Sequence, residues 1–283
     1  MPTGVKKTKQ LLEKLYKKYN HKKNIAPDPL QFVYKYKKPA DMEIVALLSA
    51  MLAYGRVQQI EKSLTDLFTR FDRSPFDFVV NFNKAKRRTL ADFKHRFNTG
   101  DDISDLLVLL KKVLNKYGSV EKFFLIGYSS KDENILPALT MFCHKLIDEY
   151  TSKHKGQISP GLKYLLTDPA RASACKRLNL FLRWMVRDDD VDAGLWENVD
   201  KAKLIVPIDI HMSRLCKILN LYDRKTVNLK AAVEITQSFK KINSADPAKY
   251  DFALSRIGIV ENCNGKLTAY CENCELNYIC KNH

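Results

Sequence analysis

The chain has 283 residues, 45% of them hydrophobic, which is enough for one large domain or two modest ones with a real core. Its longest apolar run, residues 44–55, is much shorter than the roughly 20 residues that cross a bilayer, which excludes a membrane-spanning helix. The formal net charge of +16 favours a polyanionic partner, with nucleic acid first and an anionic membrane surface second.

The N-terminal segment is basic and lacks the apolar stretch of a secretory signal, so we expect a cytoplasmic protein in a reducing compartment. The chain holds seven cysteines, and four of them cluster near its end. In a reducing compartment such a cluster indicates metal or iron–sulfur ligation more than disulfide bonds.

Helical periodicity runs along almost the whole sequence. Apolar residues recur every three or four positions, and no alternating strand pattern persists, so we predict an all-α fold class. The clearest predicted helices cover residues 40–71, 101–118, 135–153 and 174–187. We expect Asp41 to be the N-cap of the first, and Gly118 to end the second.

Several conspicuous residues are better explained by packing or solvation than by chemistry. Side chains on apolar helical faces are expected in the core, namely Cys143, Cys175, Cys216, Leu180, Phe181 and Trp184. The acidic run at residues 188–192 is expected to be a solvated turn.

The clustered cysteines are Cys263, Cys271, Cys274 and Cys280, in the pattern C-x7-C-x2-C-x5-C. A single zinc ion is usually held by two close pairs, and only one close pair is present. Four thiolates on one short loop suit a [4Fe-4S] cluster, whose irons each take one ligand. We therefore expect a [4Fe-4S] cluster, with zinc as the alternative.

A second segment of interest is PIDIHMSRL, in which Asp209 follows Pro207 and opens a predicted helix. Taken alone, this position is that of an N-cap, where the helix dipole keeps a carboxylate ionised. Lys176 opens the predicted helix at 174–187 after the small-residue turn TDPARASAC. A helix start of this kind can hold an anion, and Lys176 could equally be a surface cation that contacts phosphate.

Three of these segments resemble the helix-hairpin-helix (HhH-GPD) DNA glycosylase superfamily. The cysteine loop is similar to the C-terminal [4Fe-4S] loop of endonuclease III, with one extra residue between the first two cysteines. PIDIHMSRL resembles the superfamily motif V-D-x-H-x-x-R, and the segment EIVALLSAMLAYGRVQQIE resembles its LLSAQ helix. The chain lacks the glycines of the superfamily's hairpin.

The resemblance assigns roles to residues of this chain. Asp209 would be the catalytic carboxylate, and Lys176 would be the amine that forms a Schiff base. The long separation of the two is closest to that of archaeal 8-oxoguanine DNA glycosylases. Residues that could contact DNA or the extruded base are Met51, Tyr54, Arg56, Gln58, Ser173, Arg177, His211, Arg214 and Lys266.

The resemblance also implies two helical lobes, a central bundle at residues 40–165 and a second lobe from residues 1–39 and 166–283. We expect a monomeric base-excision glycosylase with AP lyase activity that acts on double-stranded DNA containing a damaged base. The most favoured base is 8-oxoguanine, and no membrane partner is expected. Oxidised pyrimidines or mismatched bases are alternative substrates. A non-catalytic DNA-binding repair or sensing module and a zinc-containing RNA-binding protein are alternatives from other classes.

Overall fold

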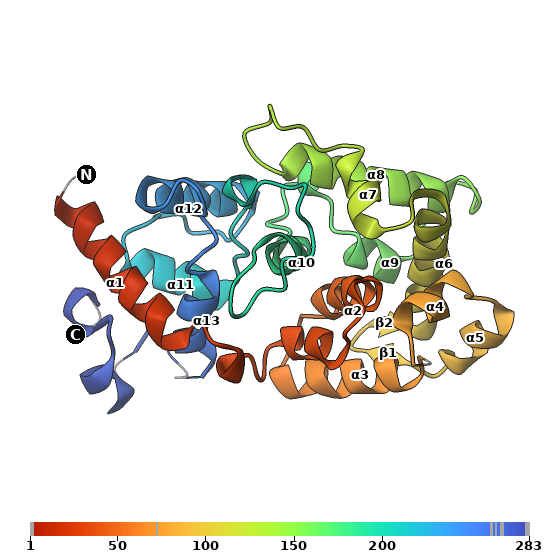
Figure 1. Cartoon of the computed structure of the whole chain (residues 1–283), viewed down its shortest axis with the longest axis horizontal. Coiled ribbons are helices and arrows are strands. Elements are labelled where there is room, and N and C mark those ends of the chain that lie inside the picture. Colours follow the sequence, from red (N-terminus) through yellow and green to blue (C-terminus); the bar gives the residue numbers. More distant parts are fainter. Residues whose placement is uncertain (1–2, 72, 261–262, 264, 267–268, 281–283) are drawn as a thin grey trace.

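The structure is a computed structural model that describes residues 3–71, 73–260, 263, 265–266 and 269–280 (Figure 1). Helices make up most of these residues, which confirms the predicted helical class. A short antiparallel hairpin of two strands was not predicted.

The α-helices are α1 (Thr3–Tyr19), α2 (Pro39–Met51), α3 (Val57–Thr69), α4 (Pro75–Val80), α5 (Lys84–Thr89), α6 (Gly100–Tyr117), α7 (Val120–Leu125), α8 (Leu136–Thr151), α9 (Pro160–Leu165), α10 (Lys176–Val186), α11 (Ile210–Ile218), α12 (Leu229–Ile242) and α13 (Asp251–Ile259). The strands are β1 (Lys94–His95) and β2 (Asn98–Thr99), and the 3-10 helices are η1 (Lys22–Asn24), η2 (Pro29–Lys35), η3 (Pro169–Arg171), η4 (Lys201–Lys203), η5 (Ala269–Asn273) and η6 (Asn277–Ile279).

The helix ends follow local sequence signals, with one correction. Gly118 has a φ of 86° directly after α6, so the predicted glycine end of this helix is confirmed. Asp41 is not an N-cap, because α2 starts two residues earlier at Pro39, whose fixed φ suits the first helical position. The buried Asp41 carboxylate instead accepts hydrogen bonds from Ser74 Oγ at 2.7 Å and Phe76 N at 2.9 Å.

Two buried helices lie at the centre of the fold. In α10 every residue after Lys176 is buried, and α2 is buried from Glu43 to its end. The two helices pack against each other, and η2 covers α2. Figure 1 shows α2 to α9 on the right, α1 and α11 to α13 on the left, and α10 between these groups. The predicted division into lobes at residues 40–165 stays a prediction.

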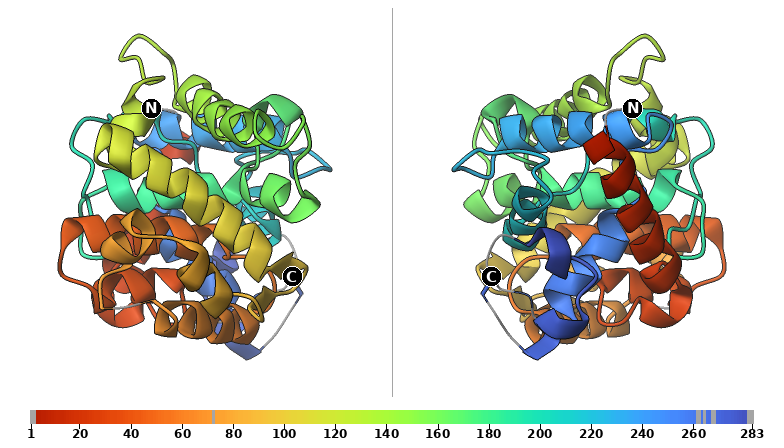
Figure 2. Two further views of the ribbon diagram at one scale, coloured as in Figure 1. Left: turned by 90° about the vertical axis from the view of Figure 1, so that its right-hand side faces the viewer. Right: turned by 90° about the vertical axis from the view of Figure 1, so that its left-hand side faces the viewer.

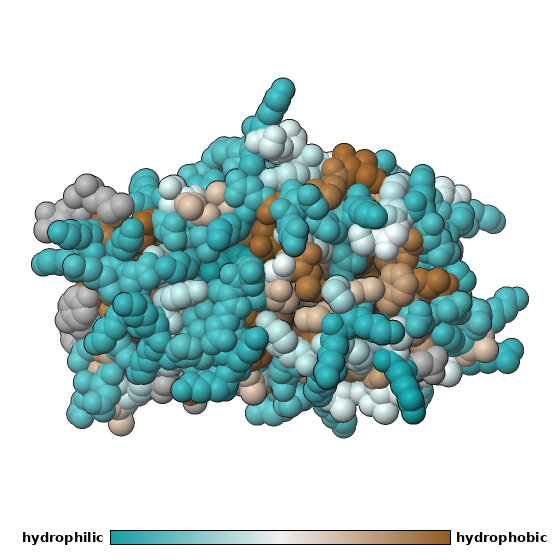
Figure 3. Space-filling model, in the orientation of Figure 1, coloured by the Kyte–Doolittle hydropathy of each residue, from teal (hydrophilic) through white to brown (hydrophobic). Residues whose placement is uncertain are grey.

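Helix α1 lies along α12 and α13, as Figure 2 also shows. Its buried side chains include Leu11, Leu12 and Leu15, while most of its lysines face solvent. The face in Figure 3 is largely hydrophilic, with apolar side chains exposed near its middle and right. None of the helices in the described ranges is both long enough and apolar enough to cross a membrane.

A buried ionic network lies at the C-terminal end of α10. Arg183 Nε donates to Asp192 Oδ1 at 3.1 Å, Arg187 pairs with the other oxygen of Asp192, and Arg187 Nε lies 3.0 Å from Asp246 Oδ1. The Asp192 side chain is fully buried, so the prediction of a solvated turn is wrong at this residue. Only the neighbouring Asp188 and Asp190 are exposed.

We expect Asp192→Ala to lower the free energy of unfolding by about 3–5 kcal/mol, because it removes the buried carboxylate that two buried guanidinium groups share. Urea denaturation measures this loss. Asp190→Ala, in the same loop but with a side chain that is 52% exposed, is the control and should change stability by less than about 0.5 kcal/mol. Equal effects of the two substitutions would contradict a structural role for the network.

Candidate active site

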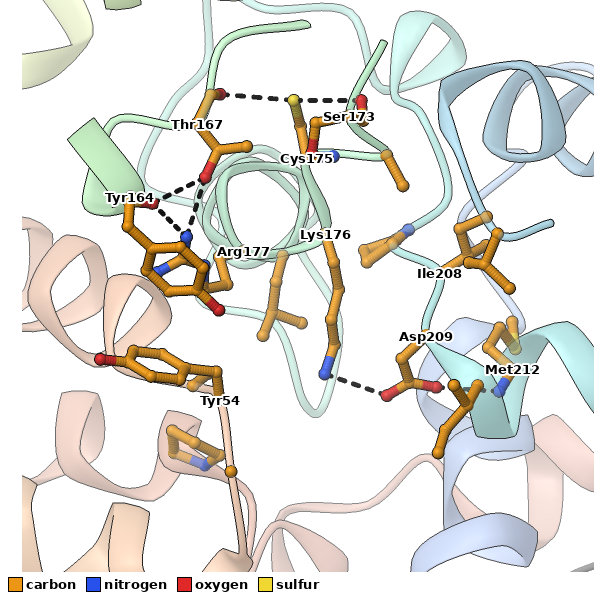
Figure 4. Close-up of a pocket in the computed structure, with 18 of the residues that line it drawn as sticks. Tyr54, Tyr164, Thr167, Ser173, Cys175, Lys176, Arg177, Ile208, Asp209 and Met212 are labelled. Atoms are coloured by element: carbon orange, nitrogen blue, oxygen red, sulfur yellow. Dashed lines mark hydrogen bonds and ion pairs between the residues drawn. The ribbon is translucent and has the colours of Figure 1, made fainter. Parts of the chain in front are cut away.

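A cavity of about 950 Å³ lies where the N-terminal ends of α10 and α11 meet the segment after α2 (Figure 4). Its wall includes Tyr54, Tyr164, Lys176, Asp209 and His211. Helix starts thus converge on a space large enough for a small organic group such as a nucleobase.

Lys176 and Asp209, the two residues predicted to carry the chemistry, meet in this cavity. Lys176 is the first residue of α10, and its Nζ lies 3.0 Å from Asp209 Oδ2. The two side chains are 35% and 31% exposed, so both can be reached from the cavity. Figure 4 shows them pointing toward each other across it.

The two carboxylate oxygens of Asp209 have separate partners. Oδ1 accepts hydrogen bonds from the backbone N–H of His211 at 3.0 Å and of Met212 at 2.9 Å, which confirms Asp209 as the N-cap of α11. Oδ2 faces Lys176. Burial raises the pKa of Asp209, but the charge of Lys176 and the Met212 N–H outweigh it, and the pKa falls below its ordinary value. Asp209 is therefore ionised at neutral pH.

The turn before α10 sets the direction of Lys176. Ala172 and Cys175 have φ values of 60° and 47°, in the left-handed region that is unusual for residues with a side chain. Cys175 Sγ donates to the Thr167 carbonyl at 3.3 Å, and burial raises its pKa to about 12. The thiol is thus neutral and helps to hold the turn, so its predicted burial is confirmed.

Arg177 lines the cavity but is largely buried. Its Nη1 donates to Met51 O at 2.7 Å, and its Nη2 donates to Thr167 Oγ1 at 2.8 Å. The guanidinium stacks on Tyr164 at 4.0 Å and on Tyr54 at 5.2 Å. In Figure 4 it points away from Lys176, and its hydrogen bonds brace the cavity wall, while the expected contact with DNA stays a prediction.

The other predicted contact residues divide into two groups. Tyr54, Ser173 and His211 line the cavity. The remainder lie outside its described lining. Met51 is completely buried, and Arg214 donates to the Cys263 carbonyl at 3.1 Å. The exposed ones are Arg56, Gln58 and Lys266. We therefore interpret Met51 as a core residue.

Tyr164 and Asp251 also line the cavity, and the sequence did not single them out. Tyr164 is on α9, where a lone aromatic residue carries no motif. Asp251 is buried and pairs with Arg183 of α10. Neither position could be found without the packing of helices that are distant in the sequence.

The cysteine loop is attached to α1. Lys18 Nζ lies 2.5 Å from Glu275 Oε1, and the hydroxyls of Tyr19 and Tyr270 are 3.2 Å apart. The first helix and the last described segment therefore form one unit.

Thiols are the ligands that iron–sulfur clusters and zinc take in proteins, and the loop supplies four of them. Burial raises the pKa of Cys274, and Cys263 and Cys271 raise it further, while the Leu276 N–H, 3.4 Å from Cys274 Sγ, lowers it. Neighbouring thiols whose charges repel one another are the kind that a metal stabilises as thiolates. Within the described residues, no three His, Cys, Asp or Glu side chains converge closely enough to hold a metal ion.

The chain belongs to the family described as "Protein of unknown function (DUF2400)", which matches residues 28–260. That range contains the cavity residues Lys176 and Asp209, and it leaves out α1 and the cysteine loop. No curated protein and no solved structure matches the chain.

Two substitutions separate the capping and ionic roles of Asp209. Asp209→Asn keeps an oxygen for the cap but loses the charge, whereas Asp209→Ala loses both. The alanine variant should therefore be less stable than the asparagine variant by about 1 kcal/mol. Because folding lowers the pKa of Asp209, ionisation stabilises the wild type relative to Asp209→Asn above the unfolded-state pKa of about 3.9. This advantage is lost as the pH falls through the lower folded-state pKa.

Urea denaturation between about pH 7 and pH 3 measures both effects. An advantage over Asp209→Asn that grew on acidification would contradict an ionised Asp209 beside Lys176.

Proposed function

We propose that the protein is a DNA glycosylase with AP lyase activity, in which Lys176 is the nucleophile and Asp209 is its charged partner. The observation that carries this proposal is the 3.0 Å contact between Lys176 Nζ and Asp209 Oδ2 in a cavity of about 950 Å³. An amine beside a carboxylate, both reachable from one cavity, is the arrangement that Schiff-base chemistry at a sugar carbon needs. The resemblance of PIDIHMSRL to the HhH-GPD motif supports the same roles.

The reaction divides between the two residues. Lys176 gives up a proton, for which Asp209 Oδ2 is the nearest described acceptor, and its neutral amine attacks C1′ of the damaged nucleotide. The bond from C1′ to the base breaks as the C1′–N bond forms, and the base leaves with the electron pair and takes up a proton. The C1′–O4′ bond then breaks, O4′ takes up the proton that the attached nitrogen gives up, and the Schiff base forms between C1′ and that nitrogen. As it passes the Lys176 proton to the leaving base, Asp209 regains its negative charge and stabilises the positive charge that develops on the sugar.

Double-stranded DNA is the proposed partner because the net charge of +16 favours a polyanion, and a target base has to leave the stack to reach a cavity. By resemblance we propose 8-oxoguanine as the base, with oxidised pyrimidines and mismatched bases as alternatives. Cys263, Cys271, Cys274 and Cys280 would hold a [4Fe-4S] cluster, whose contribution would be to stiffen the loop beside α1. Zinc in the same loop is the alternative.

A non-catalytic DNA-binding module is the second candidate. The observation that favours it is that Asp209 already caps α11 and pairs with Lys176, so both residues have a structural use without any chemistry. Trapping with borohydride separates the two candidates, since only a Schiff base can be reduced to a stable adduct.

We expect the wild type to form a borohydride-trapped adduct with at least one duplex from a panel that contains 8-oxoguanine, oxidised pyrimidines, mismatches and abasic sites. Lys176→Ala should give no adduct, and Asp209→Asn should slow trapping by about a hundredfold or more. Gel separation of the covalent complex measures both.

Lys145→Ala is the matched control, because Lys145 is an exposed lysine of α8 that lies outside the described lining of the cavity. It should trap at the wild-type rate. An adduct that survived Lys176→Ala would place the nucleophile elsewhere, and the absence of any wild-type adduct on the whole panel would rule out lyase activity.

Protein purified without oxygen should contain stoichiometric iron and sulfide, and Cys274→Ser should lose both. Elemental and sulfide analysis measures this, together with the visible absorption of the cluster. Cys143→Ala, which alters a buried cysteine of α8, should keep the full content. Stoichiometric zinc without sulfide would overturn the cluster assignment.

A further inference from the structure

The hairpin of β1 and β2 presents an exposed aromatic residue at its tip. The register pairs His95 with Asn98, so the turn consists of Arg96 and Phe97 alone. His95 and Asn98 are completely buried, whereas the Phe97 side chain is 51% exposed. A large apolar side chain that is half exposed on a short turn leaves part of its ring open to a ligand.

The hairpin is fixed to the cavity wall through polar contacts. The Tyr54 hydroxyl lies 2.5 Å from Asn98 Oδ1 and 3.1 Å from the His95 carbonyl oxygen. The His95 ring bridges Ser63 Oγ at 2.9 Å and the Tyr54 carbonyl at 3.1 Å. Because buried groups hold both strands, the tip residues keep a defined position relative to Tyr54.

Phe97 continues a cluster of aromatic rings that begins inside the cavity. Its ring centroid lies 4.6 Å from that of Tyr164 and 5.5 Å from that of Tyr54, and both tyrosines line the cavity. Tyr164 is itself 39% exposed. The three rings, which we call the aromatic ledge, therefore extend from the cavity wall to the outer surface.

Cationic groups accompany the ledge. The Arg96 guanidinium lies 5.8 Å from the centroid of the Tyr54 ring, and Arg177 stacks on Tyr164 and Tyr54 from within. Gly55, with a φ of 102°, makes room for this arrangement, since a Cβ there would come within 2.9 Å of Arg96 Cδ. Exposed rings with arginines beside them suit a ligand that combines flat aromatic groups with negative charge, which describes a nucleic acid strand with an unstacked base.

We propose that the aromatic ledge stacks an unpaired nucleobase next to the nucleotide that enters the cavity, and that Phe97 is its main contact. The proposal rests on the proposed function for the presence of DNA, but it concerns recognition and not the reaction. The protein would then bind a duplex with an unpaired base more tightly than a fully paired duplex of the same length and charge. Phosphate contacts are equal in the two duplexes, so the part of their affinity ratio that is lost with the Phe97 ring reports stacking.

The test compares binding to two duplexes by fluorescence anisotropy, one fully paired and one with a stable abasic-site analogue opposite an adenine. Phe97→Ala should reduce the preference for the abasic duplex by about tenfold, in keeping with the cost of removing one stacked ring. Phe97→Leu, which stays apolar but has no ring, should lose most of the preference, whereas Phe97→Trp should keep it. Since Phe97 is half exposed, these variants should fold.

Ile126→Ala is the matched control, because Ile126 is 48% exposed and lies outside the described lining of the cavity, and it should keep the wild-type ratio. An unchanged ratio in Phe97→Ala would overturn the ledge while leaving the proposed function intact. Failure of the wild type to bind either duplex would instead overturn both. A preference that Phe97→Leu retained in full would show that apolar contact and not stacking is responsible, which also contradicts the proposal.

Discussion

The burial of α10 is the constraint on which the rest of the structure depends. Every residue of this helix after Lys176 is buried, and near its C-terminal end the charged Arg183, together with Arg187 directly after the helix, is buried as well. Those charges can be buried only because Asp192, Asp246 and Asp251 reach them from later parts of the chain. The helix is thereby fixed both along its length and in its rotation. Lys176 stands at its one accessible end, so the network that holds the far end of α10 also determines where the lysine amine lies in the cavity.

The same helix couples the cavity to distant segments. Asp251, the first residue of α13, lies in the cavity wall and pairs with Arg183, while His211 on α11 has its Cβ 3.0 Å from the place that a Cβ on Gly258 would occupy. A side chain at Gly258 would therefore press on the turn that follows Asp209. The approach of α10, α11 and α13 is what brings an amine from one helix to a carboxylate on another. The position of the site follows from helix packing. Its two polar groups, the Lys176 amine and the Asp209 carboxylate, lie at the N-terminal ends of α10 and α11.

Local signals in the sequence predicted local features well. The glycine after α6, the cap at Asp209 and the start of α10 near Lys176 each depend on a few adjacent residues, and each is where the pattern indicated. The prediction of a solvated turn at residues 188–192 is wrong at Asp192, because the arginines that neutralise it, Arg183 on α10 and Arg187 directly after it, face inward. Likewise, Arg177 was expected to contact DNA or the extruded base, and no local pattern shows that its partners include the Met51 carbonyl and the ring of Tyr164. The hairpin is two residues per strand, too short for an alternating pattern to be visible.

The division of labour between the two oxygens of Asp209 has a consequence for motion. One oxygen is tied to two backbone N–H groups of α11, and the other meets only the lysine among its described hydrogen-bond and ion-pair partners. When the amine moves away from its partner, the carboxylate cannot rotate to follow, because rotation would break the cap. When the lysine departs, Asp209 Oδ2 therefore faces the cavity in a fixed orientation and does not turn freely. The helix cap thus holds the Asp209 carboxylate in one orientation, so the Lys176 side chain is the group that moves.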